Sequence, residues 1–400
     1  MTVLDPKIEG LKYEMQEDAP RRARIKVVGV GGGGANAVAY MMSAGLEGVE
    51  FYVVNTDMQA LGASPVPNKL AIGSKITNGR GTGGDVGLGR QAALDETERI
   101  IEMLQGADMV FVAAGLGCGT GTGAAPVIAG LAKQLNAITV AVVTKPFGFE
   151  GARPMKQAEK GLSELGATVD TVIVVPNDRL LALAPRGTSV VEAFRMGHDL
   201  LRQTVQDIVE IITTPGLVNR DLADIRATMH GTGYSMMGTA LGKGENAALE
   251  AARQAISWPL LEGASIRGAR DIFLNFTASS RLGLHEVNEA CALIRKAAEN
   301  DDVQVTFGIV LNETMGEAVK LTVIATGFPR GEAGAASGGE PLVQPAWPPP
   351  PESEVAAARP TPPEPLPPTP AVAVPPPREE AVDPEDYEQP AYVRQGKVLH

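Results

Sequence analysis

The sequence has few aromatic residues and no excess of positive charge. Aromatic side chains make up 4% of the 400 residues, and the formal net charge at pH 7 is −12. An acidic chain lacks the positive field that attracts a phosphate backbone, and it offers few rings on which bases could stack. The composition therefore argues against a nucleic-acid-binding protein, and we expect no nucleic-acid partner.

Cysteine and long apolar runs are also scarce. Cys118 and Cys291 are the only cysteines, too few for a disulfide framework or a zinc site, which indicates a reducing, cytoplasmic compartment. The apolar runs are too short to cross a bilayer as a helix, so we expect membrane contact only through a partner and no direct insertion. Residues 1–22 are charged and have no apolar core, so no signal peptide is expected.

Glycine and proline are abundant but gather in different parts of the chain. Glycine crowds residues 29–130, whereas proline crowds the stretch after Pro341. Residues 330–382 lack apolar periodicity and cannot bury enough surface to offset ordering entropy, so we predict a disordered, proline-rich linker. The composition changes again in residues 383–400, where a short partner-binding peptide is expected.

Apolar, β-branched runs of strand length alternate with helix-like stretches in the first half of the chain. Runs that are almost continuously apolar suggest strands covered on both faces, as in a parallel sheet. The pattern predicts a doubly wound, Rossmann-like α/β domain over residues 24–189. The expected strands are 24–30, 50–55, 107–115, 137–144 and 171–177, and the expected helices are 34–43, 88–105, 121–135 and 153–165.

The second half of the chain has a different pattern of predicted helices and strands. A long amphipathic central helix is expected at 190–213, followed by a smaller α/β domain with a mixed sheet over 214–329. The residues before this ordered part, 1–23, are expected to be flexible. The expected strands of the smaller domain are 271–279, 303–311 and 318–328, with helices near 245–257 and 285–298.

Three glycine-rich segments precede predicted helices, at 29–34, 79–84 and 115–123. Missing side chains let backbone amides approach a phosphate closely, and a helix N-terminus adds partial positive charge. One such segment could equally be a tight structural turn. Three of them, together with threonines, suit a triphosphate. The sequence has no GxxxxGK[ST] motif, so this is not a P-loop enzyme.

The segment GLGCGTGTG at 115–123 resembles the glycine-rich signature of the tubulin/FtsZ superfamily of GTPases. Flanking segments such as IKVVGVGGGGANAV, VNTDMQAL and PGLVNRDLADIRATM match the bacterial FtsZ family in order and spacing, over about residues 24–328. This resemblance implies a cell-division GTPase that binds GTP, GDP and Mg²⁺ through its first domain. It also implies head-to-tail protofilaments, a C-terminal activation domain at 214–329 and a cytoplasmic ring at mid-cell.

The resemblance assigns nucleotide-binding residues but no protein ligand for the metal. Residues 55–57 are expected to face the nucleotide, although Asp57 could alternatively bind the ribose of a dinucleotide. Glu150 is expected at the ribose, Phe194 against the base, and His198 at the position that reads the base. The phosphates are expected on Gly32, Gly33, Gly34, Ala35 and Asn36, and on Gly119, Thr120 and Gly121.

In the family, a loop after the central helix completes the active site of the neighbouring subunit. The matching residues here are Asn219, Asp221 and Asp224. Asp221 and Asp224 are three apart at the start of a predicted helix, so both carboxylates fall on one face. From spacing alone they could be a helix cap and a first-turn acid. The resemblance favours a catalytic role, with which capping is compatible.

The end of the chain resembles the family's adaptor-binding peptide. It implies docking to a membrane-anchored division adaptor, such as an FtsA-like protein. The residues that carry this likeness are Pro390, Ala391, Tyr392, Val393 and Arg394.

Several positions depart from the family pattern. Cys118 replaces a glycine, and its thiol is expected either to have a lowered pKa at the helix N-terminus or to turn away from the phosphate. Residues 85–87 replace Asn-Pro-Glu, Pro154 replaces an arginine, and His198 replaces Asp or Asn. These departures keep open a second class, a filament-forming nucleotide-binding protein with weak hydrolysis. A nicotinamide-dependent enzyme is disfavoured by the second glycine segment.

Overall fold

The computed structural model describes residues 23–185, 187–214, 222–257 and 266–328. Strands and helices alternate through the first half of the chain: β1 (Ile25–Val30), α1 (Gly31–Ser43), β2 (Val49–Asn55), α2 (Met58–Ala63), β3 (Asn68–Ala71), α3 (Ser74–Thr77), α4 (Val86–Asp95), α5 (Thr97–Leu104), β4 (Met109–Gly115), α6 (Gly119–Gln134), β5 (Ile138–Lys145), η1 (Gly148–Glu150), α7 (Ala152–Thr168), β6 (Thr171–Pro176), α8 (Asn177–Leu183) and α9 (Val190–Thr213). The later elements are α10 (Leu222–Met229), β7 (Gly233–Lys243), α11 (Ala247–Ile256), β8 (Asp271–Ala278), α12 (Leu284–Ala298), β9 (Gln304–Leu311), η2 (Glu313–Met315) and β10 (Ala318–Thr326).

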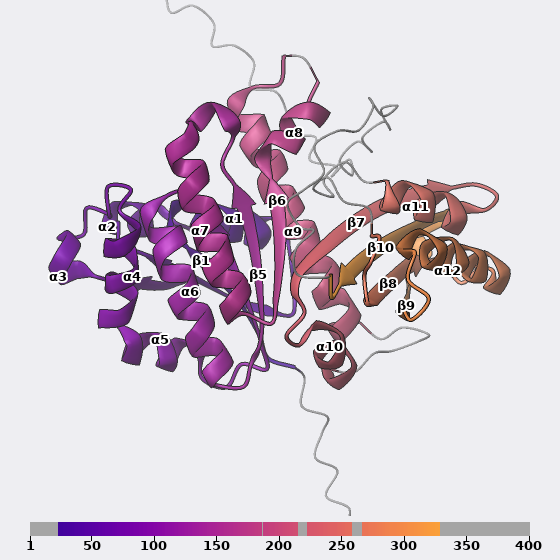
Figure 1. Ribbon diagram of the computed structural model, residues 1–400, viewed down its shortest axis with the longest axis horizontal. Coiled ribbons are helices and arrows are strands. Elements are labelled where there is room, and N and C mark those ends of the chain that lie inside the picture. Colours follow the sequence, from indigo (N-terminus) through magenta and orange to yellow (C-terminus); the bar gives the residue numbers. More distant parts are fainter. Residues whose placement is uncertain (1–22, 186, 215–221, 258–265, 329–400) are drawn as a thin grey trace, which may run out of the picture. The chain divides into compact units, whose positions relative to one another are not determined.

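The strands form one sheet in the order β3-β2-β1-β4-β5-β6-β7-β10-β8-β9. The first six pair in parallel, and their order is that of the doubly wound dinucleotide-binding fold. Helices α4, α5, α6 and α7 cover one face of these strands, and α1 and α9 cover the other (Figure 1). The predicted doubly wound, Rossmann-like fold class is therefore confirmed.

The central strands are buried on both faces, which explains their continuous apolar sequence. In β4, Phe111 packs into the core beneath α1 and α9. Its neighbours Val110 and Val112 pack into the separate core beneath α4 to α7. Because successive side chains of a strand point to opposite faces, a strand covered on both sides needs an unbroken apolar run.

β7 joins the first half of the chain to the C-terminal strands. Its first residues, Gly233 to Ser235, pair in parallel with β6, and the rest of the strand pairs antiparallel with β10. β8 is antiparallel to β10 and parallel to β9, which gives the predicted mixed sheet. Helices α11 and α12 pack on one face of these strands around a third core (Figure 1). The other face turns toward α9, since Phe273 and Ile324 belong to the core that α9 shares.

Local details of the sequence prediction were wrong. The single helix predicted at 88–105 is two helices, α4 and α5, because Glu96 leaves helical backbone angles (φ −112°, ψ 25°). The helices expected to start at 34 and 121 begin at Gly31 and Gly119, so glycines form their first turns. Strands β3 and β7 and helices α2, α3 and α8 were not predicted, because they are short or only partly apolar, whereas the helix expected after Asp221 is present as α10. The domain boundaries proposed from the sequence stay predictions.

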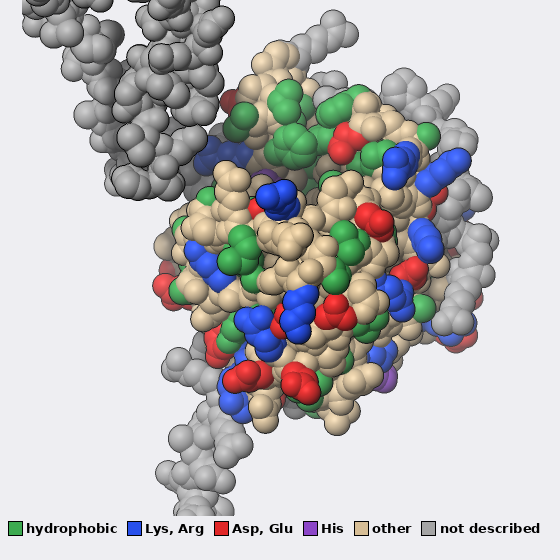
Figure 2. Space-filling view, turned by 90° about the vertical axis from the view of Figure 1, so that its left-hand side faces the viewer, with side chains coloured by type: hydrophobic (Ala, Val, Ile, Leu, Met, Phe, Trp, Pro, Cys, Tyr) green, Lys and Arg blue, Asp and Glu red, His purple; other side chains and the backbone are tan. Residues whose placement is uncertain are grey.

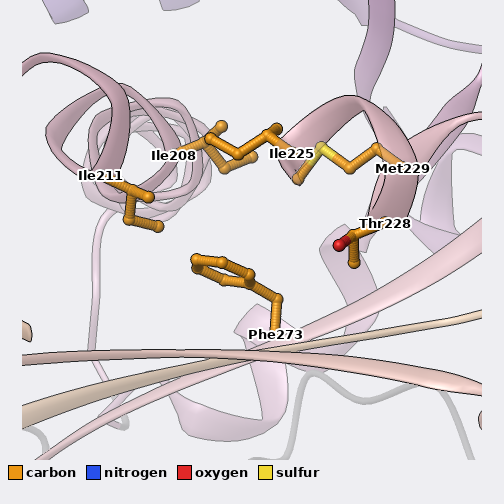
Figure 3. Close-up of a pocket in the computed structure, with 6 residues that line it drawn as sticks. All are labelled: Ile208, Ile211, Ile225, Thr228, Met229 and Phe273. Carbon is orange, nitrogen blue, oxygen red and sulfur yellow. The ribbon is translucent and has the colours of Figure 1, made fainter. Parts of the chain in front are cut away.

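A small apolar gap lies where α9 and α10 approach β8. Figure 3 shows the side chains that surround it, which are Ile208, Ile211, Ile225, Thr228, Met229 and Phe273. Protein interiors are normally close-packed, so the apolar contact between α9 and the C-terminal strands is incomplete at this point.

Candidate functional site

The two glycine segments that follow strands meet at one place in the sheet. β1 and β4 are parallel neighbours, with Val30 opposite Ala114, and each ends at a glycine-rich turn into a helix. The strand order reverses between these two strands, so their carboxyl ends form the crevice where doubly wound folds bind ligands. The topology therefore brings the N-termini of α1 and α6 together.

Glycine is required there because the two segments touch through their backbones. A Cβ on Gly34 would lie 2.2 Å from the carbonyl oxygen of Ala113, in β4. A Cβ on Gly31 would lie 2.8 Å from the amide nitrogen of Gly121. Gly31 also has a φ of +70°, a backbone conformation that residues with a side chain rarely adopt. Any side chain at these positions would push the N-termini of α1 and α6 apart.

Two other glycines, in the first turn of α1, are accessible to solvent. Gly32 and Gly33 are exposed, and a Cβ on Gly32 would meet nothing within 4 Å. Asn36 is exposed one turn later, whereas Ala35 is buried. The first amides of a helix have no partner within the helix, so this open turn of α1 can accept an anion.

The third glycine segment packs on the start of α6. A Cβ on Gly119 would lie 2.2 Å from the hydroxyl oxygen of Thr82 and 2.6 Å from the carbonyl oxygen of Asp85. The hydroxyl of Thr120 lies 2.8 Å from that of Thr56 and 3.5 Å from that of Thr82. Three hydroxyls from separate segments thus converge beside the amides of α6, which gives the site polar partners for phosphate oxygens. Thr82 was not singled out from the sequence, although it lies within the third glycine segment.

Residues 55–57 lie at the end of β2, at the same edge. The side-chain oxygen of Asn55 accepts a hydrogen bond from the Thr56 amide at 2.9 Å. The carboxylate of Asp57 accepts from the amides of Gln59 and Ala60 and so caps α2. Asp57 therefore has a structural role beyond the strand, which does not favour its alternative reading as the ribose ligand of a dinucleotide.

Cys118 is exposed at the N-cap of α6. Partial burial, and then the nearby carboxylate of Glu150, raise the pKa of its thiol above the ordinary value. Of the two alternatives for Cys118, a lowered pKa is therefore contradicted, because burial and Glu150 both raise it. The influence of Glu150 also places that carboxylate close to the second glycine segment. Its carboxylate accepts a hydrogen bond from the Phe147 amide at 2.8 Å.

Pro154 packs against the same glycine segment. A Cβ on Gly117 would lie 3.0 Å from the Pro154 carbonyl oxygen, and Gly117 has a φ of +99°. Proline brings no side-chain donor to this edge. Arg153, the preceding residue, is exposed in the first turn of α7.

An aromatic cluster lies beside Glu150. The ring of buried Phe147 stacks on Phe149, with 4.9 Å between centroids, and meets the Phe194 ring edge-on at 5.3 Å. Phe149 is 71% exposed and Phe194 43% exposed, so the cluster presents two rings to solvent. Figure 2 shows that hydrophobic side chains also gather toward the top of the molecular face formed by α2 to α5. Exposed rings of this kind can stack on a planar base.

His198 lies one helical turn after Phe194, with its ring 6.5 Å from that of Tyr40. Burial lowers the pKa of the His198 imidazole below its ordinary value, so the ring is neutral near pH 7. The neighbouring carboxylate of Asp199 accepts from the Tyr40 hydroxyl at 3.3 Å, from Arg202 at 2.8 Å and from Gln203 at 2.7 Å. Asp199 is therefore already engaged and is poorly placed to take over a base contact from His198.

Asp224 lies in the first turn of α10, at the other end of the fold. Two residues later, Arg226 donates to the carbonyl of Asn136 at 2.9 Å, just beyond the C-terminal end of α6. The glycine segments lie at the N-terminal end of α6, whose 16 residues span ~24 Å. The structure thus separates Asp224 from the glycine segments of its own molecule. Other predicted residues lie outside the described part of the chain: Asn219, Asp221, Pro390, Ala391, Tyr392, Val393 and Arg394.

Two family models match the chain. The GTPase domain of the tubulin/FtsZ family matches residues 24–185, and the C-terminal domain of the FtsZ family matches residues 233–329. An empty FtsZ dimer from M. jannaschii is 37% identical with a TM-score of 0.70, over 77% of this chain and 89% of that chain. A GTPγS-bound CetZ2 protofilament from Haloferax volcanii is 23% identical with a TM-score of 0.68, over 78% of this chain and 95% of that chain. The second likeness concerns the fold alone.

Two neighbouring glycines provide a test of the site geometry. Gly34→Ala should lower the free energy of unfolding by about 1–3 kcal/mol, because its methyl group would overlap the Ala113 carbonyl. Gly32→Ala should change it by less than about 0.5 kcal/mol, because the space around Gly32 is open. Urea unfolding of both variants measures this difference. Equal stability of the two variants would contradict the close backbone contact.

Proposed function

The chain belongs to the tubulin/FtsZ family, and we propose that it is a GTP-hydrolysing cytoskeletal protein that polymerises head to tail into the protofilaments of a division ring. In this proposal the nucleotide binds between the glycine segments of one subunit, and the acidic residues that follow α9 come from the next subunit. Its cellular place would be cytoplasmic, at the mid-cell division site. The bacterial origin expected from the sequence stays a prediction.

Nucleotide binding is proposed from the convergence at the ends of β1 and β4. Open amides at Gly32 and Gly33 and the exposed side chain of Asn36, together with the first turn of α6, would hold the phosphates. The exposed rings of Phe149 and Phe194 would flank the base, near His198. Glu150, which acts electrostatically on Cys118 and is next to Phe149 in sequence, would contact the ribose.

The observation that carries the proposal is the separation between Asp224 and the glycine segments. The acidic turn of α10 contacts the C-terminal end of α6, about one helix length from the phosphate-binding end. A carboxylate so far away cannot act on a nucleotide bound to its own molecule. Head-to-tail stacking would bring the acidic end of one subunit onto the glycine segments of the next.

Hydrolysis needs a positioned water molecule and stabilisation of the charge that develops on the phosphates. The backbone amides of α1 and α6 and the hydroxyls of Thr56, Thr82 and Thr120 would stabilise that charge. The carboxylates of Asp221 and Asp224, with the Asn219 side chain, would orient the water from the neighbouring subunit.

Magnesium would accompany the nucleotide rather than occupy a cage made by the protein. Within the described residues, no group of three His, Cys, Asp or Glu side chains could hold a metal ion. Mg²⁺ prefers phosphate and water oxygens in such sites, so hydroxyls such as that of Thr120 suit its outer contacts. When bound, the ion neutralises phosphate charge.

The C-terminal peptide would provide the link to the membrane. No helix in the described ranges is long and apolar enough to cross a bilayer. We propose that residues 390–394, carried on the linker 330–382, dock on a membrane-anchored division adaptor, such as an FtsA-like protein. One weak contact per subunit would give strong recruitment when many copies line a filament.

The alternative function is a filament protein that binds nucleotide but hydrolyses it weakly. Pro154 favours this alternative, because it packs on the second glycine segment without offering a donor to the phosphates. Turnover measured with and without polymerisation separates the two functions.

If the active site forms between subunits, turnover must depend on protein concentration. We expect GTP turnover per subunit to fall steeply below a threshold concentration. Asp221→Ala and Asp224→Ala should each bind GTP with an unchanged Kd and form filaments, but lose at least about tenfold in turnover, since a water-orienting group is removed. Pelleting and phosphate release, run together over a dilution series, measure both quantities. Constant turnover per subunit on dilution would exclude a shared site.

Base selection should be weaker than with a carboxylate at position 198. Neutral His198 offers one acceptor, whereas a carboxylate can accept from both the N1–H and the amino group of guanine. His198→Asp should therefore strengthen the preference for GTP over inosine triphosphate by about 1–3 kcal/mol, roughly 5- to 150-fold. His198→Asn, which has one acceptor, serves as the control. Equal selectivity in His198→Asp and the unmodified protein would show that residue 198 does not read the base.

The tail proposal predicts separable functions. A chain that ends at Pro384 should polymerise and hydrolyse GTP normally, because residues 24–329 carry both activities in this proposal. It should no longer co-sediment with adaptor-coated vesicles. Tyr392→Ala should weaken this recruitment, and Tyr387→Ala, outside the proposed contact residues 390–394, is the matched control. Full recruitment of the truncated chain would disprove the docking role.

A further inference from the structure

Asp207 is a charged residue in the middle of α9 whose side chain has no exposed surface. Its carboxylate is paired with the ammonium group of Lys320, on β10. The second carboxylate oxygen accepts a hydrogen bond from the Thr322 hydroxyl, also on β10, at 2.8 Å. Thr322 lies 3.1 Å from the hydroxyl of Thr239, on β7. These contacts join α9 to two strands of the C-terminal sheet.

Lys320 is held in its charged form beside Asp207. Burial by itself would lower the pKa of Lys320, but the charge of Asp207, their hydrogen bond and nearby Glu210 together raise that pKa above its ordinary value. Asp207 is fully buried, whereas the Lys320 side chain is 27% exposed. Such a pair is costly to desolvate and contributes little net stability, whereas a shift that separates its members leaves the buried charge of Asp207 unpaired. The contact therefore favours one position of α9 on the sheet over neighbouring positions.

The apolar contact beside the pair does not provide that selectivity. Apolar attraction is non-directional, and Ile208, Ile211 and Phe273 line the small gap between α9, α10 and β8 (Figure 3). An incompletely filled apolar surface allows small displacements that a directional, buried ion pair resists. Asp207 lies next to Ile208 in sequence, so both kinds of contact act on the same turn of α9.

A row of polar contacts along α9 leads from this pair toward the candidate base site. Arg202 bonds Asp199 at 2.8 Å and also bonds Gln206, which in turn donates to Glu210. These residues are three or four apart, so they share one face of the helix. Both Arg202 and Glu210 influence the pKa of Lys320, which shows that the row lies within electrostatic reach of the buried pair.

We propose that Asp207, Lys320 and Thr322 form a polar lock that fixes the position of α9 on the C-terminal sheet, and that this lock positions the acidic segment after α9 for catalysis. The inference rests on the proposed function, because it concerns the same acidic segment. α9 ends at Thr213 and α10 begins at Leu222, so the position of α9 sets where the segment between them starts. Asp207 and Lys320 are positioning residues, since they act through α9.

The decisive variant replaces both charges together. Asp207→Leu combined with Lys320→Met removes the ion pair while keeping side-chain size, and Thr322 retains Thr239 as a partner. Such replacements of buried pairs are often neutral or stabilising. We expect a melting temperature at or above that of the unmodified protein and a Kd for GTP within twofold. Turnover at saturating protein should nevertheless fall at least tenfold.

Two matched variants complete the experiment. Lys320→Arg keeps the charge pair and should retain turnover within threefold. Arg267→Gln breaks the exposed Arg267–Glu299 pair of the C-terminal part and should leave turnover unchanged. If the double variant does not fold, Asp207→Asn, which keeps shape but removes the charge, should lower turnover at least fivefold. Full turnover in a folded double variant, or in Asp207→Asn, would overturn the lock.

Amide hydrogen exchange separates this inference from the proposed function. The lock predicts at least tenfold faster exchange in residues 204–213 and 318–324 of the double variant, with unchanged exchange in β1 and β4. If the unmodified protein hydrolyses no GTP at any concentration, the proposed function is wrong. The amide exchange rates of the double variant then test the polar lock by themselves. Unchanged exchange in both segments would overturn it.

Discussion

The close backbone contact between the ends of β1 and β4 is the constraint on which the candidate site depends. Gly34 packs on the Ala113 carbonyl, and Gly31 packs on the Gly121 amide, with no room for a Cβ between them. Because the two segments touch, the N-termini of α1 and α6 point into one crevice rather than two. Their unpaired amides and their helix dipoles then act on the same anion. The third glycine segment extends this arrangement, since Thr82 packs on Gly119 and adds a hydroxyl to the pair formed by Thr56 and Thr120.

Two long helices, α6 and α9, separate the glycine segments from the acidic turn of α10. α6 begins at the crevice and ends near Asn136, where α10 is attached through Arg226. α9 begins beside the aromatic cluster and ends just before the acidic segment. The phosphate-binding end and the acidic end are thus held apart by rigid helices, and no local rearrangement of a loop would bring them together. The active site that we propose to be divided between two copies is compatible with this geometry.

α9 is the element through which the two halves of the chain act on each other. One of its faces shares a core with β1, β4 and β5, and its Asp207 reaches the C-terminal sheet. The apolar part of that contact is incompletely packed, whereas the polar part is directional. The directional polar contact therefore restrains the register of α9 on the C-terminal sheet more than the apolar contact does. The same helix carries His198 and Phe194, the residues proposed to contact the base.

The sequence alone determined the fold class and indicated which glycine segments make up the candidate site. Continuous β-branched runs predicted the parallel strands because a strand buried on both faces needs apolar residues throughout, as Phe111 and Val112 show. Glycine segments predicted the anion site because only glycine tolerates such backbone proximity, and the resemblance to a GTPase family assigned Glu150, Phe194 and His198. Other features depended on tertiary packing. The pKa of Cys118 rises because packing partly buries the thiol and, to a smaller extent, because Glu150 acts on it from a separate segment. Asp199 is occupied by Tyr40 from α1, and Asp207 finds its partner Lys320 more than a hundred residues away. A one-dimensional pattern records which residues are apolar, small or charged. Which charges meet is decided only when distant segments are folded against one another, because burial and proximity set the free energy of each pair.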